Sequence, residues 1–218
     1  MKESRRDAIK KLAVVPALLS FPALLSANSS TGRTKTASSK RLQYSVNAYS
    51  FNNEFRSGEM DLFDMMEFAA DIGLNAVDLT AYYFSSYPKL PEKPEIFALK
   101  KRALELGLNI SWTGIRNNFV TADTEARNRD IKMIKDWLDV SSTIGSSILR
   151  IFTGKNQPKG YTKEEVKAWL VEAFKECAQH GAEVGVIAAL QNHNEFLFTA
   201  DEVINLSLIH ISEPTRPP

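Results

Sequence analysis

The sequence predicts an α/β fold built on a parallel sheet, and three observations support this prediction. Short apolar runs alternate with longer amphipathic segments through residues 42–205. The apolar runs begin roughly 31 to 39 residues apart, which leaves room for one helix between successive strands. The composition, 44% hydrophobic and 24% charged over 218 residues, is that of a globular chain.

Five apolar runs are predicted as strands, because each is short and is bounded by turn residues. Gly73, Gly107 and Gly145 each stand just before one of these runs. The predicted strands cover residues 43–50, 74–80, 108–113, 147–152 and 184–191.

The segments between the strands carry helix start and stop signals. Pro94 suits a first helical turn, and Gly145 suits the position after a helix end. Thr162–Glu165 and Thr199–Glu202 have the spacing of capping boxes. The predicted helices cover residues 61–72, 94–106, 125–144 and 162 to about 180, and a last one begins at 199.

Open doubly wound sheets and (β/α)₈ barrels both fit this alternation. The first strand-to-helix turn, Tyr49–Glu54, has no glycine-rich phosphate fingerprint, which disfavours the dinucleotide-binding version of the open sheet. A complete barrel needs about 250 residues. We therefore predict the first five βα units of a (β/α)₈ barrel over residues 42–205, with the fifth unit truncated.

Residues 1–27 are predicted to be an export signal. A basic segment is followed by the apolar stretch Leu12–Leu25 and then by small residues, which is the order found in signal peptides. Ser4-Arg5-Arg6 is similar to a twin-arginine signal, so the expected location is the periplasm. The stretch is too short for a stable membrane span, and an uncleaved anchor or a disordered leader is the alternative. Residues 28–41, rich in Ser, Thr and Lys, are predicted to be a linker.

Residues 206–218 are predicted to be an artefact. Leu206–Arg216 reads LSLIHISEPTR, the translation of a transposase-type sequencing adapter. We therefore exclude this segment from the predicted fold. The alternative is an ordinary helix end followed by a proline stop.

Charge and cysteine content exclude several classes of partner. Setting aside the leader and the tail, residues 28–205 carry 21 basic and 23 acidic side chains, which does not favour nucleic acid or an anionic membrane. The single Cys177 excludes an internal disulfide and any Cys-rich metal site, and it is predicted to pack in the core. The sequence carries no signal for an oligomeric state.

Candidate site residues follow the predicted strands, because sites in parallel α/β folds form at the carboxyl ends of the strands. Asp78 and His193 are the candidate catalytic residues. Gln191 shares a face with His193 at the end of the fifth predicted strand. The candidate substrate-binding residues are Tyr49, Trp112, Arg116, Asn117 and Arg150.

Each candidate has a structural alternative. Arg150 either binds a substrate oxygen or forms an ion pair with Asp78 inside the sheet. Asp78 is a general base, or it is the partner of Arg150 or a helix cap. His193 contacts metal or substrate, or it donates to a loop carbonyl. Tyr49 and Trp112, like Tyr82, stack on a sugar ring or fill the core.

The ordered set of strand ends resembles the xylose isomerase-like TIM-barrel superfamily, and most of all its sugar phosphate isomerase/epimerase branch. The resemblance covers about residues 42–205. It is carried by Tyr44–Phe51, Gly73–Leu79, Gly107–Ile110, Arg116–Phe119, Leu149–Phe152 and Leu190–His193.

The resemblance implies a (β/α)₈ barrel that uses one divalent metal, such as Mn, Mg or Zn, to move a proton through an enediolate. Strand five of that family ends in a Glu that binds the metal, whereas Gln191 stands at this position here. An amide oxygen is a weaker, neutral ligand, which puts the metal in doubt. The expected partner is a small carbohydrate.

Two functions follow from these observations. The first is a sugar or sugar-phosphate isomerase/epimerase, of which this chain alone is expected to be inactive. The second is a metal-free carbohydrate-binding or scaffolding barrel, which Gln191 favours. The related DNA-repair endonucleases are disfavoured, because they rely on several His ligands and residues 28–205 contain only His180 and His193.

Overall fold

The computed structural model of the chain describes residues 42–193 and 196–210. The predicted export signal, the linker up to residue 41 and the tail after residue 210 lie outside these residues. The strands are β1 (Ser45–Asn47), β2 (Ala76–Thr80), β3 (Asn109–Gly114), β4 (Ile148–Ile151) and β5 (Ile187–Leu190). The α-helices are α2 (Asn52–Ser57), α3 (Leu62–Asp71), α4 (Lys93–Glu105), α5 (Thr124–Ile144), α6 (Lys163–Val184) and α7 (Ala200–His210). Two short 3₁₀ helices, η1 (Ala48–Phe51) and η2 (Ala81–Tyr83), follow β1 and β2.

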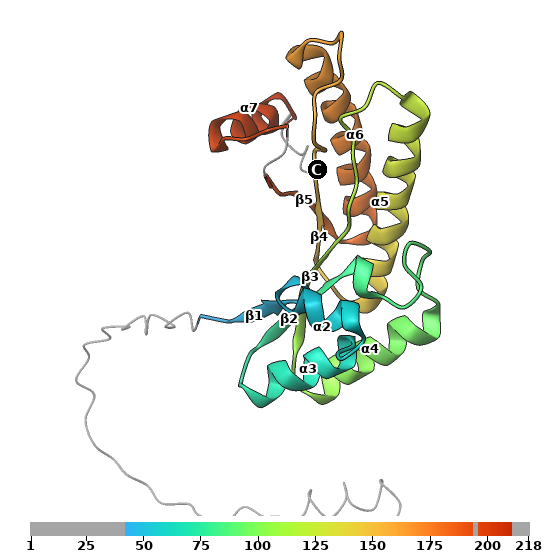
Figure 1. The fold of residues 1–218 in the computed structure, drawn as a ribbon, viewed down its shortest axis with the longest axis vertical. Helices are drawn as coiled ribbons and strands as arrows, with labels where there is room; N and C mark the ends of the chain where they lie inside the picture. The colour runs from blue at the N-terminus through green and yellow to red at the C-terminus, as the bar shows by residue number, and fades with distance from the viewer. Residues whose placement is uncertain (1–41, 194–195, 211–218) are drawn as a thin grey trace, which may run out of the picture. The chain divides into compact units, whose positions relative to one another are not determined.

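The five described strands form one parallel sheet in the order β1-β2-β3-β4-β5, which confirms the predicted α/β class (Figure 1). Register places Asp78 between Asn47 and Trp112 on the neighbouring strands. One step further along, Gly114 lies between Thr80 and Arg150. Because side chains alternate between the two faces of a strand, these two rows share one face of the sheet.

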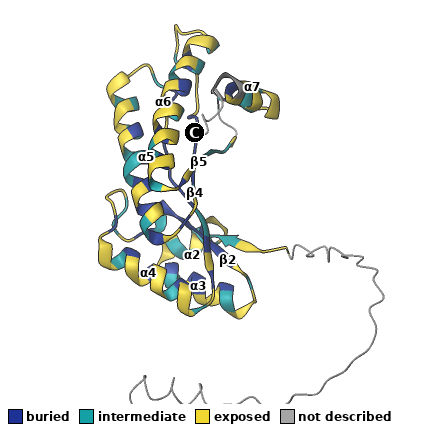
Figure 2. Cartoon of the chain, turned by 180° about the vertical axis from the view of Figure 1, so that it is seen from behind, coloured by how far each residue is buried: buried dark blue, intermediate teal, exposed yellow. Residues whose placement is uncertain are grey.

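The opposite face of the sheet packs against helices and forms the core. Helices α3 to α6 follow one another along this face, and their outer surfaces are exposed while the central strands β2 and β4 are mostly buried (Figures 1 and 2). Val77, Leu79 and Leu149 are fully buried on it. Trp137 of α5 is also fully buried and meets the ring of Phe84 edge-on, with the centroids 5.4 Å apart. Cys177 is buried as predicted, and burial raises the pKa of its thiol to about 12.

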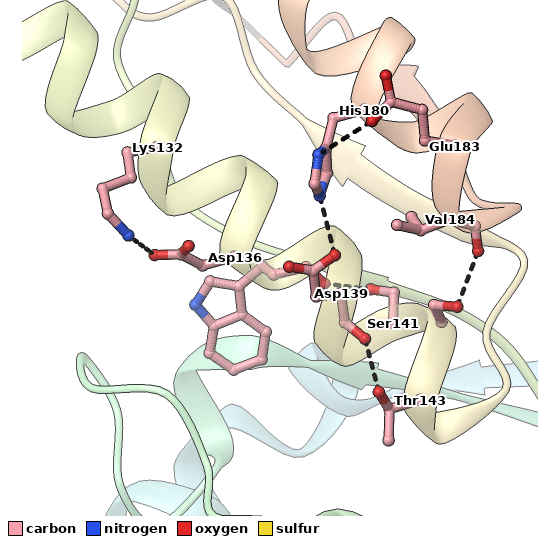
Figure 3. Close-up of polar contacts among 10 residues, drawn as sticks. Lys132, Asp136, Asp139, Ser141, Thr143, His180, Glu183 and Val184 are labelled. Atoms are coloured by element: carbon pink, nitrogen blue, oxygen red, sulfur yellow. Dashed lines mark hydrogen bonds and ion pairs between the residues drawn. The ribbon is translucent and has the colours of Figure 1, made fainter.

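Polar contacts join α5 to α6 at the surface (Figure 3). The ring of His180 on α6 lies 2.9 Å from the carboxylate of Asp139 on α5, and its other nitrogen lies 3.9 Å from Glu183. Ser142 of α5 donates to the carbonyl of Val184 at 2.8 Å. Exposed contacts of this kind contribute little each, about 0–1 kcal/mol, so the buried faces of the two helices supply most of their packing energy.

Several helix signals read from the sequence are confirmed. The Thr162 hydroxyl caps α6 in a capping box with Glu165, and Thr199 and Glu202 exchange hydrogen bonds in the same way. α5 ends at Ile144, and Gly145 adopts the left-handed conformation after it, with a φ of 95°. These local signals need no tertiary context, and for that reason the sequence alone reveals them.

Several boundaries differ from the predictions: the fifth strand begins at Ile187 instead of residue 184, and the short helix α2 stands where no helix was predicted. The first strand ends at Asn47 instead of residue 50, because the Asn47 side chain accepts from the backbone N–H of Tyr49 at 2.7 Å and turns the chain into η1. α6 continues to Val184 instead of ending near Gly181, and its end is marked by Gly185 with a φ of 75°.

The last described helix, α7, continues beyond Asn205 to His210, and the Leu206 side chain is buried. Among the residues that the structure describes, no helix combines the length and apolar character needed to cross a membrane.

Gly181 lies inside α6 because the following strand approaches its backbone. Its carbonyl accepts from the N–H of Val186 at 2.8 Å, and a Cβ at this position would overlap the Val186 carbonyl oxygen. We predict that Gly181→Ala lowers the free energy of unfolding by about 1–3 kcal/mol through overpacking. Helix propensity alone predicts the opposite sign, a gain of up to about 1 kcal/mol. Urea unfolding of the two proteins distinguishes these outcomes, and stabilisation would contradict the close approach.

Candidate functional site

A cavity of about 790 Å³ opens at the carboxyl ends of the strands. Its walls come from β1, β3 and β4, from the segments that follow the strands, and from α5. It is lined by Asn47, Tyr49, Tyr82, Trp112, Arg116, Asn117, Asn118, Asp130, Arg150, Phe152, Gly154, Lys155, Asn156, Gln191 and His193.

The structure brings the predicted site residues together. Seven of them line the cavity, namely Tyr49, Trp112, Arg116, Asn117, Arg150, Gln191 and His193. The eighth, Asp78, is buried beside the cavity wall, because Asn47, which lines the cavity, donates a hydrogen bond to it. The rule that sites form at the carboxyl ends of parallel strands therefore locates the cavity correctly.

Asp78 is the most perturbed acid of the site. Its side chain is 1% exposed, and one carboxylate oxygen, Oδ1, has no hydrogen-bond partner among the described residues. Burial raises the pKa of Asp78 to about 7, although the charge of Arg150 and the hydrogen bond from Asn47 both oppose this rise. A carboxyl group with such a pKa exchanges its proton near neutral pH, as a general acid or base must.

Arg150 of β4 is a buried cation on the cavity wall. The residue is 5% exposed, and its guanidinium carbon lies 4.4 Å from the centre of the Phe152 ring. The guanidinium lies against Gly114, where a Cβ would come within 2.6 Å of its central carbon. Arg150 lowers the pKa of Asp78 through its charge, but the structure shows no direct ion pair between the two residues.

Asn117 positions the loop after β3. Its side chain donates to the carbonyl of Phe152 at 2.7 Å and accepts from the Phe152 N–H at 2.8 Å. These two bonds reproduce strand pairing beyond the end of β4. The Asn117 amide is therefore engaged by the backbone, although the residue borders the cavity.

Tyr49, Tyr82 and Arg116 lie between this cavity and a neighbouring one. The Arg116 guanidinium lies 5.5 Å from the centre of the Tyr82 ring. Arg116, Tyr49 and Tyr82 also line a second cavity of about 680 Å³, which extends toward α2 and α3. Tyr49 is 57% exposed, so its ring face is available to a ligand, whereas Trp112 is partly covered.

Gln191 and His193 follow β5 on the same side of the cavity. The Gln191 N–H donates to the carbonyl of Ile151 at 3.0 Å, which extends the parallel pairing. His193 is exposed, and its ring lies 5.7 Å from that of Phe152. Its ring makes no hydrogen bond to any residue that the structure describes, including the loop carbonyl offered as an alternative.

Some cavity residues were not predicted from the sequence. Asp130 lies on α5, beyond the strand ends, and accepts from the N–H of Asn118 at 2.6 Å. Burial raises its pKa. Lys155 and Asn156 lie in the loop after β4. Asp130 lies in the second turn of α5, and no sequence signal distinguishes it from the other acids of that helix.

A family model described as a xylose isomerase-like TIM barrel matches residues 66–207. The chain belongs to this family. The match confirms the predicted resemblance and assigns the five-stranded parallel sheet to a TIM-barrel fold. No curated protein matches the chain.

Solved structures of similar fold include sugar-converting proteins. D-psicose 3-epimerase with D-tagatose from Clostridium cellulolyticum H10 matches with a TM-score of 0.63 and 18% identity, over 77% of this chain and 59% of that one. The IolI protein with a bound zinc atom also has a TM-score of 0.63, at 16% identity over 78% and 59% of the chains. A sugar phosphate isomerase/epimerase from Parabacteroides distasonis ATCC 8503 has a TM-score of 0.52, at 17% identity over 73% and 55%.

These similarities establish the fold of the xylose isomerase-like chain. The chain spans a little under three-fifths of the length of these structures.

Ionisation of Asp78 should make stability depend on pH. Because the folded-state pKa of about 7 exceeds the ordinary value of 3.8, the folded chain holds this proton more tightly than the unfolded chain. The resulting stabilisation is complete below 3.8 and is lost as pH rises through about 7. We predict that Asp78→Asn reduces the fall of the urea midpoint between these pH values and raises stability at pH 8. Asp71→Asn, at an exposed position, is the control. Equal pH profiles for wild type and Asp78→Asn would contradict the assignment.

Removal of the Asn117 amide should destabilise the loop after β3. Asn117→Ala leaves the N–H and carbonyl of Phe152 without these partners, at a cost of about 1–3 kcal/mol for each unsatisfied buried group. Urea unfolding measures the loss, with Asn128→Ala at an exposed position of α5 as the control. A loss no larger than that of the control would show that the two bonds do not hold the loop.

Proposed function

We propose that the chain is part of a sugar isomerase or epimerase that moves a carbon-bound proton through an enediolate. The observation that carries this proposal is Asp78, a carboxyl group with a pKa of about 7 beside a strand-end cavity. Proton transfer from a carbon next to a carbonyl needs a base that releases its proton again at working pH, and such a pKa meets this need. Family membership and the sugar-converting neighbours of the same fold support it.

The other cavity residues suit a polyhydroxylated substrate. The exposed ring of Tyr49 and the ring of Trp112 offer apolar faces for a sugar ring. Arg116 supplies several donors for hydroxyl oxygens. In this proposal His193 moves a second proton or donates to the substrate carbonyl, because its ring borders the cavity and is exposed. Asn117 contributes by fixing the loop that carries Arg116.

The described residues do not by themselves fit a divalent metal. The structure contains no group of three or more His, Cys, Asp or Glu side chains suited to a metal within residues 42–193 and 196–210. Gln191, at the family's ligand position, offers a neutral amide. IolI contains a zinc atom, so a metal that polarises the substrate oxygens is proposed only for the whole protein. No step assigned to Asp78 or His193 depends on it.

The chain spans less than three-fifths of its structural neighbours, so the activity is proposed for the protein that contains this barrel segment. We expect the chain alone to be inactive and to retain the groups of β2 to β4. We also propose export to the periplasm, on the basis of the leader-like residues 1–27.

A second candidate function is carbohydrate binding or scaffolding without catalysis. The observation that favours it is the amide of Gln191 where the family resemblance implies a carboxylate. In that case Asp78 would be a structural acid beneath a sugar-binding surface. The two functions differ in one measurable property, the exchange of carbon-bound hydrogen.

Exchange of sugar protons with deuterated water tests the proposed function. A protein that contains this segment within a complete barrel is incubated with neutral, phosphorylated and carboxylated aldoses and ketoses, with and without Mn²⁺, Mg²⁺ or Zn²⁺, and NMR follows the loss of carbon-bound hydrogen. We predict exchange on at least one sugar, and a decrease of about 10²–10⁴-fold in Asp78→Asn but not in Asp71→Asn.

Sugar binding without exchange on any member of the panel would overturn the isomerase proposal in favour of the binding barrel. Exchange that persists in Asp78→Asn would support the isomerase activity but show that Asp78 is not its base.

A further inference from the structure

We propose that Arg150 binds an anionic group of the ligand, so that this cavity takes a sugar carrying a carboxylate or a phosphate. The inference names a substrate class and to that extent rests on the proposed sugar function. Its basis is a buried cation on the cavity wall that forms no hydrogen bond or ion pair with any described residue.

The first step is energetic. A charged side chain that is 5% exposed loses most of its hydration, and this cost is large unless a counter-charge or hydrogen bonds replace the water. The ring of Phe152, 4.4 Å away, provides a cation–π contact that offsets part of the cost. The N–H donors of the guanidinium meet no acceptor among the described residues, so the cavity is the place from which an acceptor can come.

The second step is the charge of the cavity as a whole. Besides Arg150, the lining contains the cations of Arg116 and Lys155 and one acid, Asp130. The Asp130 carboxylate is engaged by the N–H of Asn118, and burial raises its pKa. Asp78, beside the wall, has a pKa of about 7 and is therefore only partly ionised at neutral pH. Cations exceed ionised acids, and a low-dielectric cleft of this kind attracts anions.

The third step is geometric. Gly114 lies opposite Arg150 on β3, and the guanidinium rests where a side chain would otherwise begin. Between Gly114 and Phe152 the planar group has a fixed orientation and presents N–H donors in its plane. Two parallel hydrogen bonds from such a plane fit the oxygens of a carboxylate or a phosphate, whereas a single hydroxyl uses only one of them.

Calorimetric titration of the same protein that is used in the exchange assay tests the inference without requiring turnover. The probes are D-glucose, D-glucuronate, D-glucose 6-phosphate and inorganic phosphate, of which the first three differ only at one end of the same sugar. Hydrogen bonds to charged groups contribute about 1.5–3 kcal/mol, so at least one acidic probe should bind about tenfold or more tightly than D-glucose. The acid that binds more tightly identifies the group as a carboxylate or a phosphate.

Two variants separate the charge from its position. Arg150→Met removes the charge and keeps an apolar stem, whereas Gly114→Ala keeps the charge and displaces the guanidinium. Both should reduce the affinity for the acidic probe about tenfold, toward that of D-glucose. Lys101→Met, which removes an exposed cation on α4, should leave it unchanged. Arg150→Met should also unfold at no lower urea concentration than wild type, because it removes an unpaired buried charge.

Equal affinity for D-glucose and both acids, or no binding of either acid or of phosphate at millimolar concentration, would overturn the inference. Unchanged acid binding in Arg150→Met would do so as well. These results are separate from those of the exchange assay. Acid binding through Arg150 in a protein that exchanges no sugar proton would refute the isomerase function alone, and exchange on neutral sugars only would refute the anionic ligand alone.

Discussion

Side-chain alternation along the parallel strands determines both the core and the site. On one face, Val77, Leu79 and Leu149 are buried under the helices. On the other face, the intervening residues of these strands include Arg150, which lines the cavity, and Asp78, which is buried beside its wall. The hydrophobic burial that holds the helices to the sheet therefore also fixes where the polar groups point. Any shift of one residue in a strand would exchange the two sets.

The site combines groups that would be unfavourable in isolation. Burial raises the pKa of Asp78, and the nearby Arg150 limits that rise without forming a direct ion pair. A rigid packed layer on the far side of the strands keeps these two groups in place. Asp78 and Arg150 are buried, and their charges interact without direct contact. The surface ion pairs of α5 and α6 are in direct contact, and water screens them.

Much of the fold could be predicted from the sequence because its signals are local. Capping boxes such as Thr162–Glu165 and the stop at Gly145 act within one helical turn. The strand-end rule also selected seven residues that line one cavity, since parallel strands bring their carboxyl ends together. What escaped prediction depends on contacts between distant segments. Gly181 reads as a helix stop until Val186 is placed against it, and Asp130 reads as a surface acid until the loop at Asn118 is placed over it.

The register between β2 and β3 shifts between Val77 and Asp78, where Ser111 is passed over in the pairing. Ser111 instead donates its hydroxyl hydrogen to the carbonyl of Val77 at 3.1 Å. This extra residue decides that Trp112, and not Thr113, faces the cavity. In an alignment with a relative that lacks the extra residue, the cavity residues of the two proteins match only when the gap is placed inside this strand. A gap placed in a neighbouring loop, where gaps are usually put, would match a cavity position of one protein to a core position of the other.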